Sequence, residues 1–160
     1  MARNLSERKT VLMKNGLDPL RIAVLEKFIP QFAPQAKVLF LRGSDSRPLI
    51  FAPDALKQLG VRIEKVGKLP DVVLHLPKRR LLILLELKTP ITIKQRSQIE
   101  RSLAECSVRR EYVSALSDWR AYIRAGDSVA WDTHVWLAEV PGHMLHYNGD
   151  KFLGPRRKRV

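Results

Sequence analysis

Residues 71–88 contain two apolar runs, DVVLHL and LLILLELK, that are separated only by the polar segment PKRR. A short polar connection between two β-branched and aliphatic runs predicts a β-hairpin. Apolar residues occupy consecutive positions in both runs, so we expect both faces of these strands to be covered by other elements. This requirement favours a layered α/β architecture over an open β-sheet.

Periodic apolar positions predict helices on either side of this hairpin. These helices are expected over residues 18–32, 53–60, 93–110 and 117–126. Asp18 is expected to cap the first helix, with Pro30 and Pro34 at its end, and Ser117 is expected to cap the last helix.

Short β-branched or alternating runs predict further strands. They are expected over residues 36–43, 61–66, 111–116 and 133–140, and Asn148-Gly149 predicts a hairpin turn. Helices and strands therefore alternate around a doubly covered hairpin. The expected fold class is α/β, with a central mixed β-sheet flanked by helices.

The charge of the chain constrains its partners. The 160 residues, enough for one domain, include 29 lysines and arginines against 16 aspartates and glutamates, a net charge of +13. This excess favours a polyanion, most commonly nucleic acid, with a membrane surface as the alternative. We find no apolar run of about 18 residues and no signal peptide, so neither a spanning helix nor export is expected. The single cysteine, Cys106, suits a reducing cytoplasm.

Three charged residues lie at the ends of the predicted hairpin. Asp71 opens the first apolar run, Glu86 lies near the end of the second, and Lys88 follows two residues later. The two ends of an antiparallel hairpin meet at one edge, so Asp71 and Glu86 are expected to lie close together. Residues two apart on a strand share a face, so Lys88 is expected to point to the same side as Glu86.

Two carboxylates and an ammonium group on one surface suit metal-assisted hydrolysis. Asp71 and Glu86 are candidate ligands of Mg²⁺, which takes carboxylate and water oxygens. Such an ion lowers the pKa of bound water and neutralises charge on a phosphoryl group. Lys88 is the candidate for orienting or deprotonating the attacking water. Solvated charges at strand ends would show the same spacing by chance, so the pattern alone leaves both interpretations open.

The order Pro-Asp, then Glu-x-Lys, is that of the PD-(D/E)XK nuclease superfamily. Three segments resemble the BsuBI/PstI family of type II restriction endonucleases, namely FAPQAKVLFL (32–41), LKQLGVRIEKVGKLPD (56–71) and AWDTHVWLAEVPGHMLHYNGDKFLGP (130–155). The resemblance implies a PD-(D/E)XK restriction-endonuclease-like core. It also implies one nuclease domain over residues 1–155, followed by a basic tail over residues 156–160.

The resemblance assigns roles residue by residue. Asp71 and Glu86 match the motif acids, as catalytic residues and metal ligands. Lys88 matches the lysine of the superfamily, whereas the family has a Glu-Ala-Val-Thr-like run without it. A Ser-His-Gly-like segment of the family is missing here, and family members carry an additional N-terminal helical domain. The chain is therefore expected to be a catalytic domain whose DNA readout comes from itself or from a partner.

Basic residues around the expected site are candidates for phosphate contacts. The turn RGSDSR is expected to hold a phosphate through its amides and through Arg42 and Arg47. The helix after the second acid supplies further candidate DNA-binding residues: Lys94, Arg96, Arg101, Arg109 and Arg110. Solvated basic surfaces are the alternative for both sets. Trp131 and Trp136 are expected in the core.

The residues and the resemblance together predict a Mg²⁺-dependent type II restriction endonuclease that cleaves double-stranded DNA. Cutting both strands of a palindrome needs two active sites, so we expect a twofold homodimer. A DNA methyltransferase encoded nearby and a cytoplasmic location are also expected, with no membrane partner. The alternative is an inactive, non-specific or structure-specific DNA-binding protein with the same fold.

Overall fold

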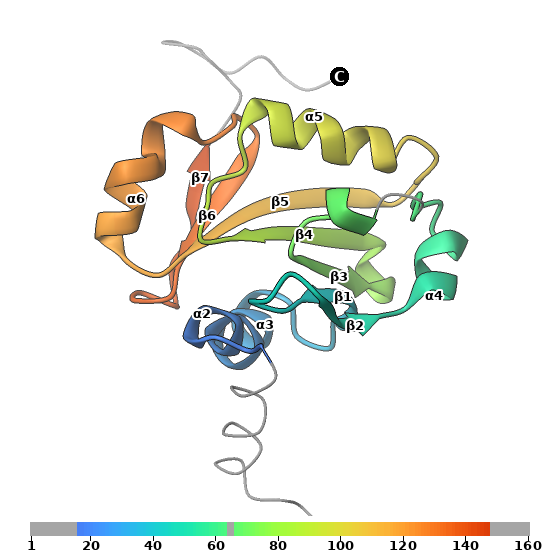
Figure 1. Ribbon diagram of the computed structural model, residues 1–160, viewed down its shortest axis with the longest axis horizontal. Coiled ribbons are helices and arrows are strands. Elements are labelled where there is room, and N and C mark those ends of the chain that lie inside the picture. The colour runs from blue at the N-terminus through green and yellow to red at the C-terminus, as the bar shows by residue number, and fades with distance from the viewer. Residues whose placement is uncertain (1–15, 64–65, 148–160) are drawn as a thin grey trace, which may run out of the picture.

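The computed structural model describes residues 16–63 and 66–147. Within these residues, seven strands form one mixed β-sheet in the order β2-β1-β3-β4-β5-β6-β7. Helices lie on both faces of the sheet (Figure 1). The strands are β1 (Lys37–Arg42), β2 (Pro48–Phe51), β3 (Val72–Leu76), β4 (Leu81–Leu87), β5 (Arg109–Leu116), β6 (Thr133–Leu137) and β7 (Leu145–Tyr147).

One face of the sheet is covered by a helical segment close to the N-terminus of the described chain. Its parts are α2 (Pro19–Ala23), a π-helical turn (Val24–Phe28) and α3 (Ile29–Phe32). Phe28 packs in one buried cluster with strand residues that include Trp136. The two rings meet edge to face with their centroids 5.4 Å apart. The apolar stripe of the first predicted helix is therefore the surface that packs against the sheet.

The other face is covered by α4 (Pro53–Gln58), α5 (Ile93–Ser102) and α6 (Trp119–Ala125). Ile99 of α5 and Leu84 of β4 belong to the buried cluster on this face. Leu85 belongs to the cluster on the opposite face. Adjacent residues of β4 are thus buried on opposite sides, and the predicted double coverage is confirmed.

β3 and β4 form the predicted antiparallel hairpin. Their paired residues run from Val72↔Leu85 to Leu76↔Leu81. A 3₁₀ turn (Pro77–Arg79) connects the strands and ends at Arg80, which has a left-handed backbone (φ 48°). The start of β3 and the end of β4 therefore lie at the same edge of the sheet.

β4, β5 and β6 are parallel neighbours. They are connected through α5 and α6, as parallel strands require crossover connections. Thr92 caps α5 in a capping box with Gln95, and α6 is capped by Asp118 rather than by the predicted Ser117. Both helices thus begin near the carboxyl ends of the strands that precede them.

The strand predicted over residues 61–66 is not observed. Residues 61–63 have no regular secondary structure, and Val66–Lys68 form a 3₁₀ turn. Val61 is buried in the cluster beneath α4 and α5, while Arg62 N donates to Ser102 O (3.0 Å). The apolar alternation therefore reflects packing against the end of α5 and not a place in the sheet.

The helix predicted over residues 93–110 ends at Ser102. The contact from Arg62 reaches its last carbonyl, and the chain then turns. Arg109 and Arg110 are the first residues of β5, so their predicted place on a helix is wrong.

Two further differences concern a proline and an edge strand. Pro30 lies inside the first helical segment instead of ending it, because the π-helical turn shifts the backbone hydrogen bonds before it, with Ile29 N donating to Val24 O. The sequence does not predict β2, whose four residues are exposed and which pairs with β1 at the edge of the sheet.

Some predictions lie outside the described residues, namely the Asn148-Gly149 turn and the basic tail over residues 156–160. In the part of the chain that the structure does describe, no helix has the length and apolar character needed to cross a membrane.

Candidate active site

Asp71 and Glu86 meet at the edge where the β3–β4 hairpin ends. The last strand pair at this end is Val72↔Leu85. Asp71 precedes Val72 and Glu86 follows Leu85, so the two acids lie opposite each other. Asp71 is 8% exposed, and its Oδ2 accepts a hydrogen bond from Leu87 N (2.9 Å). The two carboxyl groups are within hydrogen-bonding reach of each other. The proximity predicted from the sequence is confirmed.

The environment of Glu86 is unfavourable for a second negative charge. Burial, the negative charge of Asp71 and a hydrogen bond with Asp71 together raise the pKa of Glu86 to about 8, against the opposing positive charges of Arg42 and Arg21. Two carboxyl groups in this arrangement share one proton unless a cation takes its place. The pair is therefore a ready site for a positive ion.

Two arginines supply positive charge beside Asp71. Arg42 Nε lies 3.3 Å from Asp71 Oδ1, and Arg42 Nη2 donates to Leu69 O (2.8 Å). Arg21 Nη2 lies 3.8 Å from the same Oδ1, and Arg21 Nε donates to Arg42 O (2.5 Å). These contacts fix the orientation of the Asp71 carboxylate from the side of β1 and α2.

Sequence analysis missed Arg21 as a residue of this site. It is 5% exposed and follows Leu20 in the apolar stripe of α2. A charged residue that is fully buried needs a charged partner. Its position in an apolar helix stripe is the signal that would have identified it.

Lys88 does not share a face with Glu86 as predicted. β4 ends at Leu87, and Lys88 has a left-handed backbone (φ 70°), so the alternation of the strand stops before it. Its Nζ lies 2.8 Å from Asp18 Oδ2, and 60% of its side chain is exposed. A non-glycine residue in this conformation is strained, and such residues gather at functional sites.

Asp18 is the second residue that sequence analysis did not place at the site, although its capping role is confirmed. Its Oδ1 accepts from Arg21 N (2.9 Å), and its Oδ2 accepts from Arg21 Nη1 (2.7 Å). Burial raises the pKa of Asp18, but the hydrogen bonds and charges of Lys88 and Arg21 bring it below its ordinary value. Asp18 is therefore a carboxylate that is held ionised between two cations.

The donor set at the hairpin end fits Mg²⁺. Among the described residues, no three His, Cys, Asp or Glu side chains converge into a cluster that could hold a metal by themselves. Mg²⁺ does not need such a cluster, because it is commonly held by one or two carboxylates, with water and substrate phosphate oxygens completing its shell. Asp71 and Glu86 are the residues that would hold it.

The two arginines of the predicted phosphate-binding turn, Arg42 and Arg47, have different contacts in the structure. Arg42 is directed toward Asp71 and Leu69, so its observed contacts support a role in positioning Asp71 rather than in binding a phosphate. Arg47 has an 85% exposed side chain that pairs with Asp45 at 3.0 Å. Arg47 is accessible to DNA, and its contact with phosphate stays a prediction.

The basic residues of α5 also differ from one another. Lys94 and Arg101 are exposed. Arg96 is only partly exposed, because its Nη1 donates to Trp131 O (2.8 Å) and its guanidinium lies over the ring of Tyr112. Lys94, near the start of the helix, is the best placed of the three for a phosphate close to the hairpin end.

Arg109 and Arg110 lie away from the acids. In the parallel register Leu81 pairs with Arg109, whereas Glu86 pairs with Ser114, which separates them by about 16 Å along the strand. Arg110 is also engaged internally, since its Nη1 donates to Leu103 O (2.9 Å). α5 returns the chain to the edge opposite the acids before β5 begins, so Arg109 and Arg110 lie there, and their contact with phosphate stays a prediction.

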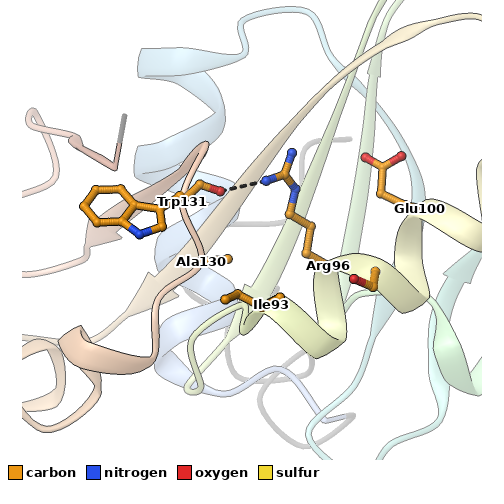
Figure 2. Close-up of a pocket in the computed structure, with 6 residues that line it drawn as sticks. Ile93, Arg96, Glu100, Ala130 and Trp131 are labelled. Carbon is orange, nitrogen blue, oxygen red and sulfur yellow. Dashed lines mark hydrogen bonds between the residues drawn. The ribbon is translucent and has the colours of Figure 1, made fainter. Parts of the chain in front are cut away.

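A surface pocket of about 420 Å³ lies between α5 and the turn before β6. Figure 2 shows Ile93 and Arg96 on α5, facing Ala130 and Trp131 on that turn. Trp131 is 51% exposed, so its expected place in the core is wrong, whereas Trp136 is fully buried as predicted.

Comparisons with known proteins identify the family to which the chain is similar. The model of the BsuBI/PstI restriction endonuclease domain matches residues 3–150. The chain is 32% identical to the type II restriction enzyme BsuBI of Bacillus subtilis over 136 residues, which cover 83% of this chain. It is 28% identical to the type II restriction enzyme AplI of Arthrospira platensis over 141 residues, which cover 82% of it.

A solved structure shares the fold. The chain superposes on the SdaI restriction endonuclease with a TM-score of 0.76 and 31% identity, covering 86% of this chain and 44% of the other. The chain also spans 43% of the length of BsuBI and of AplI. The observed sheet, with helices on both faces, is thus an α/β restriction-endonuclease-like fold. From the matched family model and the shared fold, we conclude that the chain belongs to the BsuBI/PstI restriction endonuclease family.

Proposed function

We propose that this chain is a Mg²⁺-dependent endodeoxyribonuclease domain that hydrolyses phosphodiester bonds in double-stranded DNA, as a type II restriction endonuclease. The observation that carries the proposal is the Asp71–Glu86 pair at the hairpin end of a chain of this family. Burial and mutual repulsion disfavour two negative charges there, so a bound cation would stabilise the ionised pair. The domain extends over residues 1–155, with the basic tail over residues 156–160 adding non-specific affinity for DNA.

Asp71 and Glu86 hold Mg²⁺ in this proposal. The bound ion supplies Lewis acidity, stabilising the charge on the phosphate and lowering the pKa of the attacking water. Arg42 and Arg21, from β1 and α2, keep the Asp71 carboxylate in place. Lys88 orients the water for attack on phosphorus, with the 3′ oxygen as the leaving group.

The substrate and the assembly follow from charge and symmetry. A net charge of +13 favours binding to the phosphate backbone, with the exposed Arg47 and Lys94 as candidate contacts. A twofold homodimer would place one active site on each strand of a palindrome. The proposal also includes a cytoplasmic location and a DNA methyltransferase that is encoded nearby.

Incubation of the protein with supercoiled plasmid, with Mg²⁺ and with EDTA, tests the activity. Discrete fragments that appear only with Mg²⁺ are the expected result, and Glu86→Ala should abolish them while leaving DNA binding in place. Glu105→Gln is the matched control, because Glu105 is 65% exposed and pairs with Arg62 rather than with the site. Cleavage that persists in Glu86→Ala would contradict the assignment.

A second candidate is DNA binding without site-specific cleavage. The observation that favours it is the contact of Lys88 Nζ with Asp18 instead of with the acid pair. Smearing or nicking of the plasmid would identify a non-specific or structure-specific nuclease. An unchanged plasmid together with retained DNA binding would identify an inactive binder.

A further inference from the structure

A chain of charge contacts connects Lys88 to Asp71 through the start of α2. Lys88 Nζ lies 2.8 Å from Asp18 Oδ2, and the same oxygen lies 2.7 Å from Arg21 Nη1. The second terminal nitrogen of that guanidinium, Nη2, lies 3.8 Å from Asp71 Oδ1. Asp18 thus stands between the lysine and the arginine that reaches the acid pair.

These contacts differ in burial from the ion pairs elsewhere on the surface. The side chains of Asp18 and Arg21 are 14% and 6% exposed, whereas those of Arg62 and Glu105 are 57% and 65% exposed. Removing two charges from water costs more than their attraction returns unless further hydrogen bonds compensate. Exposed pairs such as Arg62–Glu105 contribute little. Asp18 and Arg21 have such hydrogen bonds, from Arg21 N to Asp18 Oδ1 and from Arg21 Nε to Arg42 O. The pair is therefore fixed in one geometry, and a third charged group that binds it is held in a defined place.

Capping of α2 does not explain the negative charge of Asp18. Asparagine and serine cap helices about as well as aspartate. The negative charge pairs with the Arg21 guanidinium. It also binds the Lys88 ammonium, which lies on a long and flexible side chain. The left-handed backbone of Lys88 turns that side chain out of the alternation of β4, so the strand itself does not determine where the ammonium lies.

We propose that Asp18 is a positioning residue of the active site, which holds the Lys88 ammonium at the start of α2 and is itself fixed by Arg21, the residue that connects it to Asp71. The inference rests on the proposed nuclease function, because it gives Asp18 its role through Lys88. It predicts that removing the charge of Asp18 loosens Lys88 without unfolding α2.

Asp18→Asn tests this directly, since the amide oxygen still accepts from Arg21 N while the charge that faces Lys88 is lost. Asp118→Asn is the matched control. Asp118 caps α6 in the same way, with its Oδ1 accepting from Ala121 N (2.8 Å). Two measurements are made on both variants and on the unchanged protein. They are the rate of Lys88 acetylation by acetic anhydride, followed by mass spectrometry, and the steady-state kinetics of DNA cleavage.

In Asp18→Asn, acetylation of Lys88 is expected to rise several-fold, while that of the exposed Lys94 stays constant as an internal reference. The turnover number is expected to fall on the order of ten- to a hundredfold, as for a misplaced catalytic group. The KM for DNA should match that of Asp118→Asn. The melting temperature should fall below that of Asp118→Asn, because Arg21 also loses its buried partner, so both measurements are made at a temperature where circular dichroism shows Asp18→Asn folded.

Three outcomes would overturn the inference. They are an unchanged acetylation rate at Lys88, a turnover number equal to that of Asp118→Asn, and a rise in acetylation at Lys94 as large as that at Lys88, which would make Asp18 a structural residue. Failure of the proposed function is distinguishable, because the unchanged protein would then cleave no DNA while the acetylation experiment still reports whether Asp18 holds Lys88.

Discussion

Glu86 is the residue whose surroundings depart most from those of a surface carboxylate. Burial and the neighbouring Asp71 raise its pKa from 4.5 to about 8, so the metal-free protein at neutral pH keeps one proton on the pair. Both acids could be predicted from the sequence, because two carboxylates at the ends of one hairpin must meet. Arg21 and Asp18 could not, since only the packing of α2 on the sheet brings them to that edge.

The raised pKa predicts how stability depends on pH. Between pH 4.5 and 8 the folded protein retains a proton on Glu86 that the unfolded chain has lost. The contribution of the protonated Glu86 to the free energy of unfolding is therefore fully present below pH 4.5 and is lost as the pH rises through 8. Glu86→Gln cannot ionise, so its free energy of unfolding should exceed that of the unchanged protein by a growing margin over this window. Urea unfolding in EDTA at pH 5, 7 and 9 measures the margin, and a margin independent of pH would contradict the assignment.

At the scale of elements, the connection between α4 and β3 decides several features at once. Gly60 has a left-handed backbone (φ 83°), and a Cβ at this position would lie 2.5 Å from Glu105 O. The close approach lets Arg62 N donate to the end of α5 and keeps residues 61–63 out of the sheet. The sequence shows Gly60 as a helix stop, but a local pattern cannot show that a distant helix end lies against it.

Gly60→Ala is expected to destabilise the fold by about 1–3 kcal/mol or more, because it combines a strained backbone with a clash against the main chain. Gly67→Ala is the matched control, since a Cβ there meets nothing within 4 Å. Thermal or urea unfolding of both variants checks the difference. Equal stabilities would show that the chain around Gly60 relaxes without cost.

At the scale of the whole molecule, only part of the net charge of +13 is available to bind DNA. Some cations are exposed, such as Arg47 and Lys94. Others are engaged inside the fold, as Arg21 and Arg42 are around Asp71. The count of basic residues therefore predicts a polyanionic partner, but it overstates the number of phosphate contacts.

The salt dependence of DNA binding shows which of the exposed cations contact phosphates. With Ca²⁺ in place of Mg²⁺, the logarithm of the binding constant for a DNA duplex should fall linearly with the logarithm of salt concentration. Arg47→Gln and Lys94→Gln should each reduce the slope by about one. Arg109→Gln should leave it unchanged, because Arg109 begins β5 at the edge opposite the acids. A reduced slope in Arg109→Gln would extend the DNA contact to that edge.

The sequence by itself determined the doubly covered hairpin, the alternation of helices and strands, and the meeting of Asp71 with Glu86. Each follows from the period of apolar residues and from short connections, which are local properties of a chain. The tertiary structure alone decided that Lys88 turns toward Asp18 and that Arg21 and Arg42 flank Asp71. It also decided that Arg109 and Arg110 lie at the edge of the sheet opposite the acids. These arrangements depend on which distant segments pack together, and buried charges must find their partners wherever that packing places them.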